Sequence, residues 1–249
     1  MASFDLTFSD VYNQVSEFLG TGSSPTGASL IRAKNIVYRA YRQFLYPIHP
    51  NTGRLHLWSF LKRPLTIKTK GDQWQYQLPT DFSRMLKDPQ YLDNEGYGPL
   101  VKVSTDWIRR RRSESTSSTY PTHFALSPVS QDAALGTMWE LWLWPDPSGA
   151  YSIVFTYLMV PEKPTETTDL FLGGPQASEV ILQLATVIAE GQEEHGNTQK
   201  AEADRLLASM VLSDTVDTSD TLGTLYGNQI VIERNRAEND TDLVYAADR

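Results

Sequence analysis

Two short runs of alternating residues, separated by a turn, place the strongest restriction on the fold of this chain. Positions 65–68 and 73–78 each alternate between apolar and polar side chains. Because successive side chains on a strand point to opposite faces, each run has one buried and one solvated face. Lys70-Gly71-Asp72 lies between them and includes a residue that tolerates positive φ, and Pro79 ends the second run. The pattern predicts a β-hairpin.

Amphipathic helices are expected on both sides of this region. Apolar residues recur at helical spacing over 7–19 and again over 29–45. Towards the other end, Pro175 suits the first turn of a third helix, and a fourth is expected over 198–212. Because helices come from both ends of the chain, we expect a bundle in which the two ends pack together.

The middle of the chain is expected to form β structure. Strands are predicted near Tyr91 and over 123–126, 138–144 and 151–160, and the turn at 145–149 joins the last two as an antiparallel hairpin. The expected fold class is therefore α+β: a helical bundle built from both chain ends with an inserted antiparallel β domain and an extended C-terminal tail. The corresponding boundaries are 1–50 and 173–212 for the helical part, 51–172 for the β domain, with a short helix near 105–112, and 213–249 for the C-terminal arm.

The C-terminal arm has a composition of its own, rich in Ser, Thr, Asp, Asn and Gly. Three short apolar islands interrupt it, and no helical stripe joins them. A segment this polar cannot bury enough surface alone to offset the entropy of ordering it. We therefore interpret the islands as anchors for another protein. They consist of Leu222, Leu225 and Tyr226, then Ile230, Val231 and Ile232, and finally Leu243, Val244 and Tyr245.

The net charge of −8 conceals an asymmetry along the chain. No acidic residue lies between Thr21 and Gly71, whereas residues 130–249 carry six basic against 20 acidic residues. Such asymmetry favours two different neighbours, or the basic region of one copy meeting the acidic region of another, over a solvated mixed surface. The candidates for contact with DNA or with a neighbouring subunit are Arg32, Lys34, Arg39, Arg42, Arg109, Arg110, Arg111 and Arg112.

The run of four arginines is the sharpest polar feature of the chain. Consecutive residues on a helix point in different directions, so Arg109–Arg112 cannot all face one ligand. Contact with phosphate, contact with acidic residues of a neighbour and an exposed charged helix face all remain open. The sequence isoelectric point near 5.0 argues against tight, sequence-specific binding of nucleic acid.

Tryptophans mark both faces of the strand expected at 138–144. Trp139 lies on one face, whereas Trp142 and Trp144 lie on the other. Apolar groups on both faces predict burial on both sides, with one side covered by a second subunit. Core packing is the simpler interpretation, and a platform for stacking sugars or bases is a weaker one.

Catalytic, metal and membrane signatures are missing from the sequence. There is no cysteine, and His49, His56, His123 and His195 show no ligand spacing. Neither a phosphate-binding glycine loop nor a nucleophile elbow is present. The carboxylates of the arm, Asp214 among them, are interpreted as solvated. No apolar run is long enough to span a bilayer, and the N-terminus does not resemble a signal peptide. We expect neither an enzyme nor a cofactor, and no membrane partner.

Two stretches carry a family resemblance. A Trp-x-Phe at Trp58, a predicted hairpin and the exit Tyr-x-Leu-Pro-x-Asp-Phe at 76–82 follow two amphipathic helices. Further on, LWLWPDPSGAYSIVFTYLMVP at 141–161 shows the Pro-turn-strand pattern of the same group. In the order of its elements over 7–212, the chain resembles the head-to-tail adaptor proteins of tailed bacteriophages, the tail tubular protein A group.

The resemblance implies a structural role in the virion neck, after synthesis in the host cytoplasm. It implies that twelve copies form a ring below the portal protein. This ring completes the head, continues the channel for double-stranded DNA and supports the tail nozzle or tube. In such adaptors the helical part builds the ring and the C-terminal extension docks on the portal. By analogy, the islands would bind the portal, the basic residues would line the channel or meet an adjacent subunit, and Trp139, Trp142 and Trp144 would face a subunit or the nozzle.

Two other functions remain open at this point. The chain could be another neck or tail component, such as a tail-completion or terminator protein, whose ring would have sixfold symmetry. It could also be a nucleic-acid-binding or regulatory module that uses its basic N-terminal half; strong, salt-dependent binding of DNA by the monomer would favour that interpretation.

Overall fold

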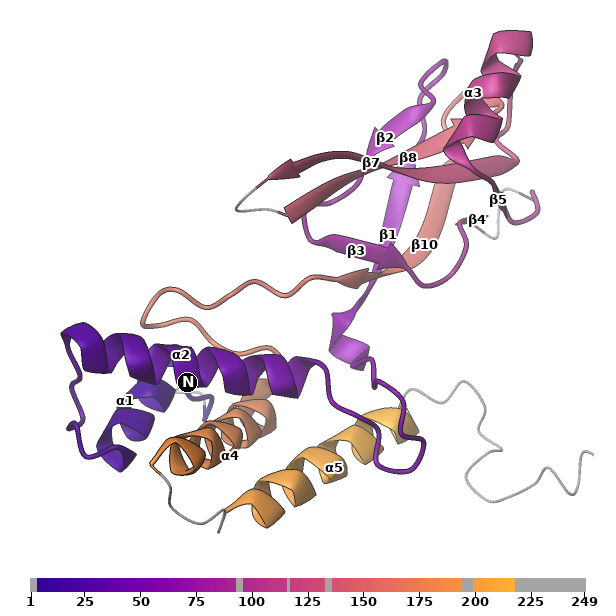
Figure 1. The fold of residues 1–249 in the computed structure, drawn as a ribbon. Coiled ribbons are helices and arrows are strands. Elements are labelled where there is room, and N and C mark those ends of the chain that lie inside the picture. Colours follow the sequence, from indigo (N-terminus) through magenta and orange to yellow (C-terminus); the bar gives the residue numbers. More distant parts are fainter. Residues whose placement is uncertain (1–3, 93–95, 116, 133–135, 194–198, 218–249) are drawn as a thin grey trace, which may run out of the picture.

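The computed structural model describes residues 4–92, 96–115, 117–132, 136–193 and 199–217. These residues form a block of helices, in the lower half of Figure 1, and a block of strands with one short helix, in the upper half. Two connections join the blocks, one over residues 46–61 and one over 160–173. The predicted mixed α+β class is confirmed.

The helical block contains four helices. They are α1 (Phe8–Phe18), α2 (Gly27–Leu45), α4 (Gly174–Gln192) and α5 (Lys200–Asp217). α2 packs against α1 and α4, α1 also contacts α4, and α5 packs on α4. Local signals account for the starts of two helices: Thr7 caps α1 in a capping box with Asp10, and Pro175 occupies the first turn of α4 as predicted.

The core of the helical block is aromatic and continues into the connection. Phe8, Phe44 and Trp58 are fully buried. The Trp58 ring stacks on Phe44 with centroids 4.9 Å apart, and its Nε1–H donates to the Phe44 carbonyl at 2.8 Å. Burial raises the pKa of Tyr41 to about 12, which keeps this phenol neutral in the core. The Trp-x-Phe motif thus fastens residues 58–60 to the end of α2.

The block of strands contains two four-stranded sheets and a short two-stranded one. In the first sheet, β10 (Ser152–Met159) pairs with β1 (Lys62–Lys68) on one side and with β3 (Phe82–Met85) and β4 (Gln90–Tyr91) on the other. The second sheet has the order β2 (Gln75–Gln77), β8 (Gly136–Trp144), β7 (His123–Asp132) and β5 (Val101–Lys102). The short sheet pairs β6 (Ser118–Thr119) with β9 (Asp146–Pro147), the 3-10 helix η1 spans Ser59–Leu61, and helix α3 spans Thr105–Glu114.

Both predicted hairpins are wrong, although the strands themselves exist. β1 pairs with β10 and β2 pairs with β8, so the two alternating runs lie in different sheets. The turn at 145–149 likewise carries the chain from β8 in one sheet towards β10 in the other. Alternation identifies a buried face but not the strand that pairs with it. The residue with positive φ in the first turn is Asp72, at 62°, rather than Gly71.

The two turns lie against each other where the chain changes sheets. The Thr69 N–H donates to the Tyr151 carbonyl at 2.8 Å, and the Asp72 N–H donates to the Pro147 carbonyl at 2.8 Å. The Thr69 hydroxyl also donates to the Gly149 carbonyl at 2.8 Å. Each turn therefore satisfies backbone groups of the other, which explains why two sequences typical of hairpins need not close onto their own flanking strands.

Helix α5 is longer than the helix predicted over 198–212. It continues to Asp217, so residues 213–217, which we had assigned to the C-terminal arm, are helical. The prediction placed the helix end where the apolar stripe ends, but the last turn is held by a polar contact that is described below. The remaining arm, residues 218–249, lies outside the described residues, and with it lie all nine island residues.

Candidate interaction surfaces

The basic residues of α2 fall into two groups. Arg32 donates to Glu193 at 2.6 Å and to Gln192 at 3.2 Å, and the Lys34 ammonium lies 5.3 Å from the centre of the Tyr12 ring. Arg39 and Arg42 are exposed, and neither forms an ion pair with another described residue. Of the four candidates on α2, these two are available to a partner.

Three of the four consecutive arginines on α3 lie over tryptophan rings of their own chain. The Arg109 guanidinium lies 5.0 Å from the centre of the Trp142 ring, Arg111 lies 5.3 Å from Trp107, and Arg112 lies 4.1 Å from Trp74. Each also has a carboxylate partner: Asp106 for Arg109, Glu114 for Arg111 and Asp146 for Arg112. Arg110 is exposed, with no ion pair to any residue in the described ranges. Because Trp107 belongs to α3 itself, Arg109 and Arg112 are the members of the run that hold α3 against the second sheet, through Trp142 of β8 and through Trp74 beside β2.

The same helix buries two of the three candidate tryptophans. Ile108 of α3 forms a separate apolar cluster with Ala125, Trp142 and Trp144, in which the two tryptophans are 6% and 8% exposed. Little of their surface is left for a second protein. Trp139, on the opposite face of β8, is partly buried and lies edge-on to Phe82 with ring centroids 6.2 Å apart.

A polar junction that the sequence did not reveal holds the end of α5 to the first connection. Asp214 accepts a hydrogen bond from His56 Nε2 at 2.8 Å and from the Ser59 N–H at 3.1 Å, and the Ser59 hydroxyl also donates to it. The side chains of His56 and Asp214 are 9% and 11% exposed. Our interpretation of Asp214 as a solvated carboxylate is wrong, because α5 carries it into a largely buried site where it accepts the N–H of Ser59, the first residue of η1. Nothing local links two residues this far apart in sequence.

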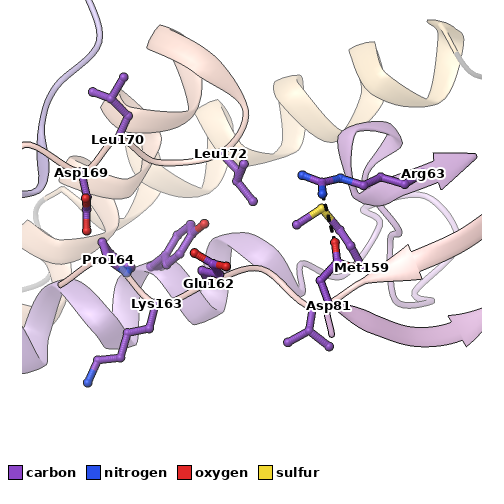
Figure 2. A pocket seen from close by; sticks show the side chains of 11 residues that line it. Arg63, Asp81, Met159, Glu162, Lys163, Pro164, Asp169, Leu170 and Leu172 are labelled. Atoms are coloured by element: carbon purple, nitrogen blue, oxygen red, sulfur yellow. Dashed lines mark hydrogen bonds and ion pairs between the residues drawn. The ribbon is translucent and has the colours of Figure 1, made fainter. Parts of the chain in front are cut away.

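A polar pocket lies between the two blocks, beside the second connection (Figure 2). Arg63 and Asp81 pair at 3.0 Å at its β side, whereas Lys163, Asp169 and Leu170 line it from the connection. The Tyr157 hydroxyl also donates to Asp81 at 3.0 Å. Burial and this hydrogen bond raise the pKa of Tyr157, so the phenol stays protonated at neutral pH. Arg63, Asp81 and Tyr157 thus bind one another and brace the point where β10 leaves the sheet.

A metal-ligand cluster and a membrane-spanning helix are both missing from the ranges that the structure describes. Within those ranges, no group of three or more His, Asp or Glu side chains is arranged to hold a metal ion. None of the described helices is both long and apolar enough to cross a membrane.

The profile of the SU10 adaptor protein family matches residues 6–224 of the chain. The match includes every described helix and strand. The chain belongs to the SU10 adaptor protein family. The resemblance to phage head-to-tail adaptors agrees with this family, which comprises structural adaptors of bacteriophages and indicates a place in the virion. A search of curated proteins finds no match.

Proposed function

We propose that this adaptor forms a ring of twelve copies between the portal and the tail nozzle or tube, where it completes the head and continues the DNA channel. The observation that carries the proposal is the family match, which spans both blocks of the molecule and not one module alone. An adaptor contacts one partner on each side, and a chain with two blocks provides two distinct ends for these contacts.

In this proposal the helical block builds the ring, as a bundle drawn from both ends of the chain, and the block of strands faces the tail. A ring made of identical copies needs two unlike surfaces on each copy. The uneven distribution of charge along the chain supplies such a difference. Trp139 is our candidate for contact with a subunit or the nozzle, since Trp142 and Trp144 are covered by α3.

The C-terminal arm, residues 218–249, is our candidate for docking on the portal through its apolar islands. The Asp214 junction fixes the last turn of α5, so the arm leaves the folded protein from a defined point beside the first connection. Of the basic candidates, Arg39, Arg42 and Arg110 are the ones available to channel DNA or to a neighbouring subunit.

Cryo-electron microscopy of the protein mixed with its portal tests this proposal. We expect a twelvefold ring below the portal, with residues 218–249 running along portal surfaces. A sixfold ring lower in the tail would assign the chain to a terminator or tube instead. Deleting residues 218–249 should leave ring-forming, folded protein that no longer binds the portal, and normal binding by the shortened chain would refute the docking role of the arm.

A further inference from the structure

A groove of about 570 Å³ runs between the exposed side of α2 and the second connection. Its floor is aromatic and aliphatic: Tyr41 and Leu45 are 5% and 4% exposed, whereas Tyr46 at one end is 47% exposed. Residues of α2 from Asn35 to Leu45 line it together with Tyr46, which follows the helix, and at 1.5 Å per residue this stretch is about 16 Å long. An extended segment of about five residues spans that distance.

Three cations stand around this apolar floor. Arg39 and Arg42 are exposed and have no ion pair in the part of the chain that the structure describes, and Lys163 lies 4.0 Å from the centre of the Tyr38 ring. Glu162 is the acidic residue among the lining side chains. A ligand that fits must offer both carboxylates and apolar side chains. A phosphate backbone would satisfy the cations but would leave the floor uncovered and would approach Glu162.

Two segments of the arm combine carboxylates with an apolar island and contain no basic residue. The first island has a single carboxylate, Asp220, between the end of α5 and its apolar residues, whereas the third has three, one for each cation of the groove. Before the third island, Leu243-Val244-Tyr245, the chain carries Glu238, Asp240 and Asp242 with no basic residue among them. The second island is followed by one acidic residue, Glu233, and two basic residues, Arg234 and Arg236, so its flank has a net positive charge that the cations of the groove would repel. Charge complementarity therefore selects residues 238–245 from the arm.

The geometry of the chain allows this segment to reach the groove. α5 ends at Asp217, and Asp214 accepts a hydrogen bond from His56, whose N–H donates to the Pro47 carbonyl at 2.9 Å. Pro47 directly follows Tyr46, which lines the end of the groove. The arm therefore starts beside the groove. A tether of about twenty residues has a root-mean-square span of roughly 25 Å, and such tethers give effective concentrations in the millimolar range.

We propose that residues 238–245 bind in this groove of their own molecule while the protein is free. The carboxylates of Asp240 and Asp242 lie against Arg39 and Arg42, and Leu243-Val244-Tyr245 covers the tyrosine floor. The contact covers an apolar surface until the arm engages another partner. This inference concerns the free chain and does not depend on what the arm binds in the virion.

Disulfide trapping in the full-length free protein tests the contact, because the natural chain has no cysteine to interfere. Asn35→Cys, in the groove, is combined with Val244→Cys in the third island or, as the matched control, with Val231→Cys in the second. Without binding, the tether to residue 231 is about half as long, so that pair would close about threefold faster. If the segment binds in the groove, the order reverses and the Val244 pair forms its disulfide faster than the Val231 pair. The product is a monomer with an internal crosslink.

Charge reversal separates specific binding from chance contact. Arg39→Glu with Arg42→Glu should slow crosslinking of the Val244 pair about tenfold, and adding Asp240→Arg with Asp242→Arg should restore it. Arg54→Glu, a single charge reversal at an exposed site outside the groove, should leave the rate unchanged, and the restored rate of the fourfold variant shows that the fold tolerates the reversals on α2. Three outcomes would overturn the proposal. The Val231 pair could close faster than the Val244 pair, as tether length alone requires. The charge reversal at Arg39 and Arg42 could leave the rate of the Val244 pair unchanged, or the crosslinks could join two molecules. None of these outcomes bears on portal binding, which the deletion of residues 218–249 tests separately.

Discussion

Replacing Asp214 with alanine should release the last turns of α5 from the first connection. The substitution removes the acceptor for His56 Nε2, for the Ser59 N–H and for the Ser59 hydroxyl. Hydrogen bonds to a charged group contribute about 1.5–3 kcal/mol each, and a buried donor left without its partner adds a further cost. Because these contributions overlap and relaxation lets water reach the site, we expect a net loss of about 3 kcal/mol.

Hydrogen exchange of α5 measures this loss directly. At about 1.4 kcal/mol per factor of ten, a loss of about 3 kcal/mol speeds exchange of the protected amides of α5 by roughly a hundredfold. The matched control is Glu202→Ala, on the same helix, which removes an exposed ion pair with Arg205 at 2.5 Å. Exposed pairs of this kind contribute below about 1 kcal/mol, so exchange should change by less than about fivefold.

The pattern of exchange along the chain distinguishes a junction from a merely exposed carboxylate. In Asp214→Ala, amides of residues 56–61 should also exchange faster, because Asp214 accepts the N–H of Ser59, the first residue of η1. Asp214→Asn should lie between the wild type and alanine, since an amide oxygen still accepts from Ser59. Equal exchange in Asp214→Ala and Glu202→Ala would refute the conclusion that this polar contact holds the end of α5.

Three further predictions concern α3, the second sheet and the arm. Arg112→Ala loses both its ion pair to Asp146 and its contact with the Trp74 ring, so it should destabilise the protein by about 1–2 kcal/mol in urea unfolding, whereas Arg110→Ala should change stability by less than about 0.5 kcal/mol. Burial and the nearby Arg111 lower the pKa of His123 from its ordinary value of 6.5, so the unfolded chain binds this proton more readily; stability should fall as pH drops below about 6.5 towards the folded-state pKa, and His123→Gln should reduce that slope in thermal unfolding. Deletion of residues 218–249 should leave the melting temperature within a few degrees of the full-length value, since a segment this polar buries too little apolar surface to contribute much to stability.

Local signals made the helices and strands predictable from the sequence. The apolar repeat of α1 and its capping box involve residues within one or two turns of each other, and Pro175 marks the start of α4 by its own stereochemistry. The alternating runs likewise identified β1 and β2. Their pairing depends on β10 and β8, which lie far along the chain, so the local turn sequence pointed to the wrong partners.

The candidate surfaces were less predictable, because charge counts do not show which side chains bind within the chain. The four arginines of α3 look equivalent in sequence, but three of them lie over Trp142, Trp107 and Trp74. The junction of Asp214 left no local signal at all. The groove beside α2 did leave one, since its exposed residues recur every three or four positions from 35 to 46, opposite the apolar stripe.

Basic residues that already bind groups of their own chain are less available to attract a neighbouring subunit. The acid-free stretch and the arginine run suggested two basic surfaces, one in each block of the molecule. Within the described residues, Arg109, Arg111 and Arg112 of the run each have a carboxylate and a tryptophan partner in the same chain, and Arg32 is paired with Glu193. Of the eight basic candidates, Arg39 and Arg42 are two exposed cations that lie close together, on α2 of the helical block. If subunits of this adaptor attract one another through charge, the salt dependence of assembly should therefore respond to substitutions at these two residues and not to Arg109 or Arg111.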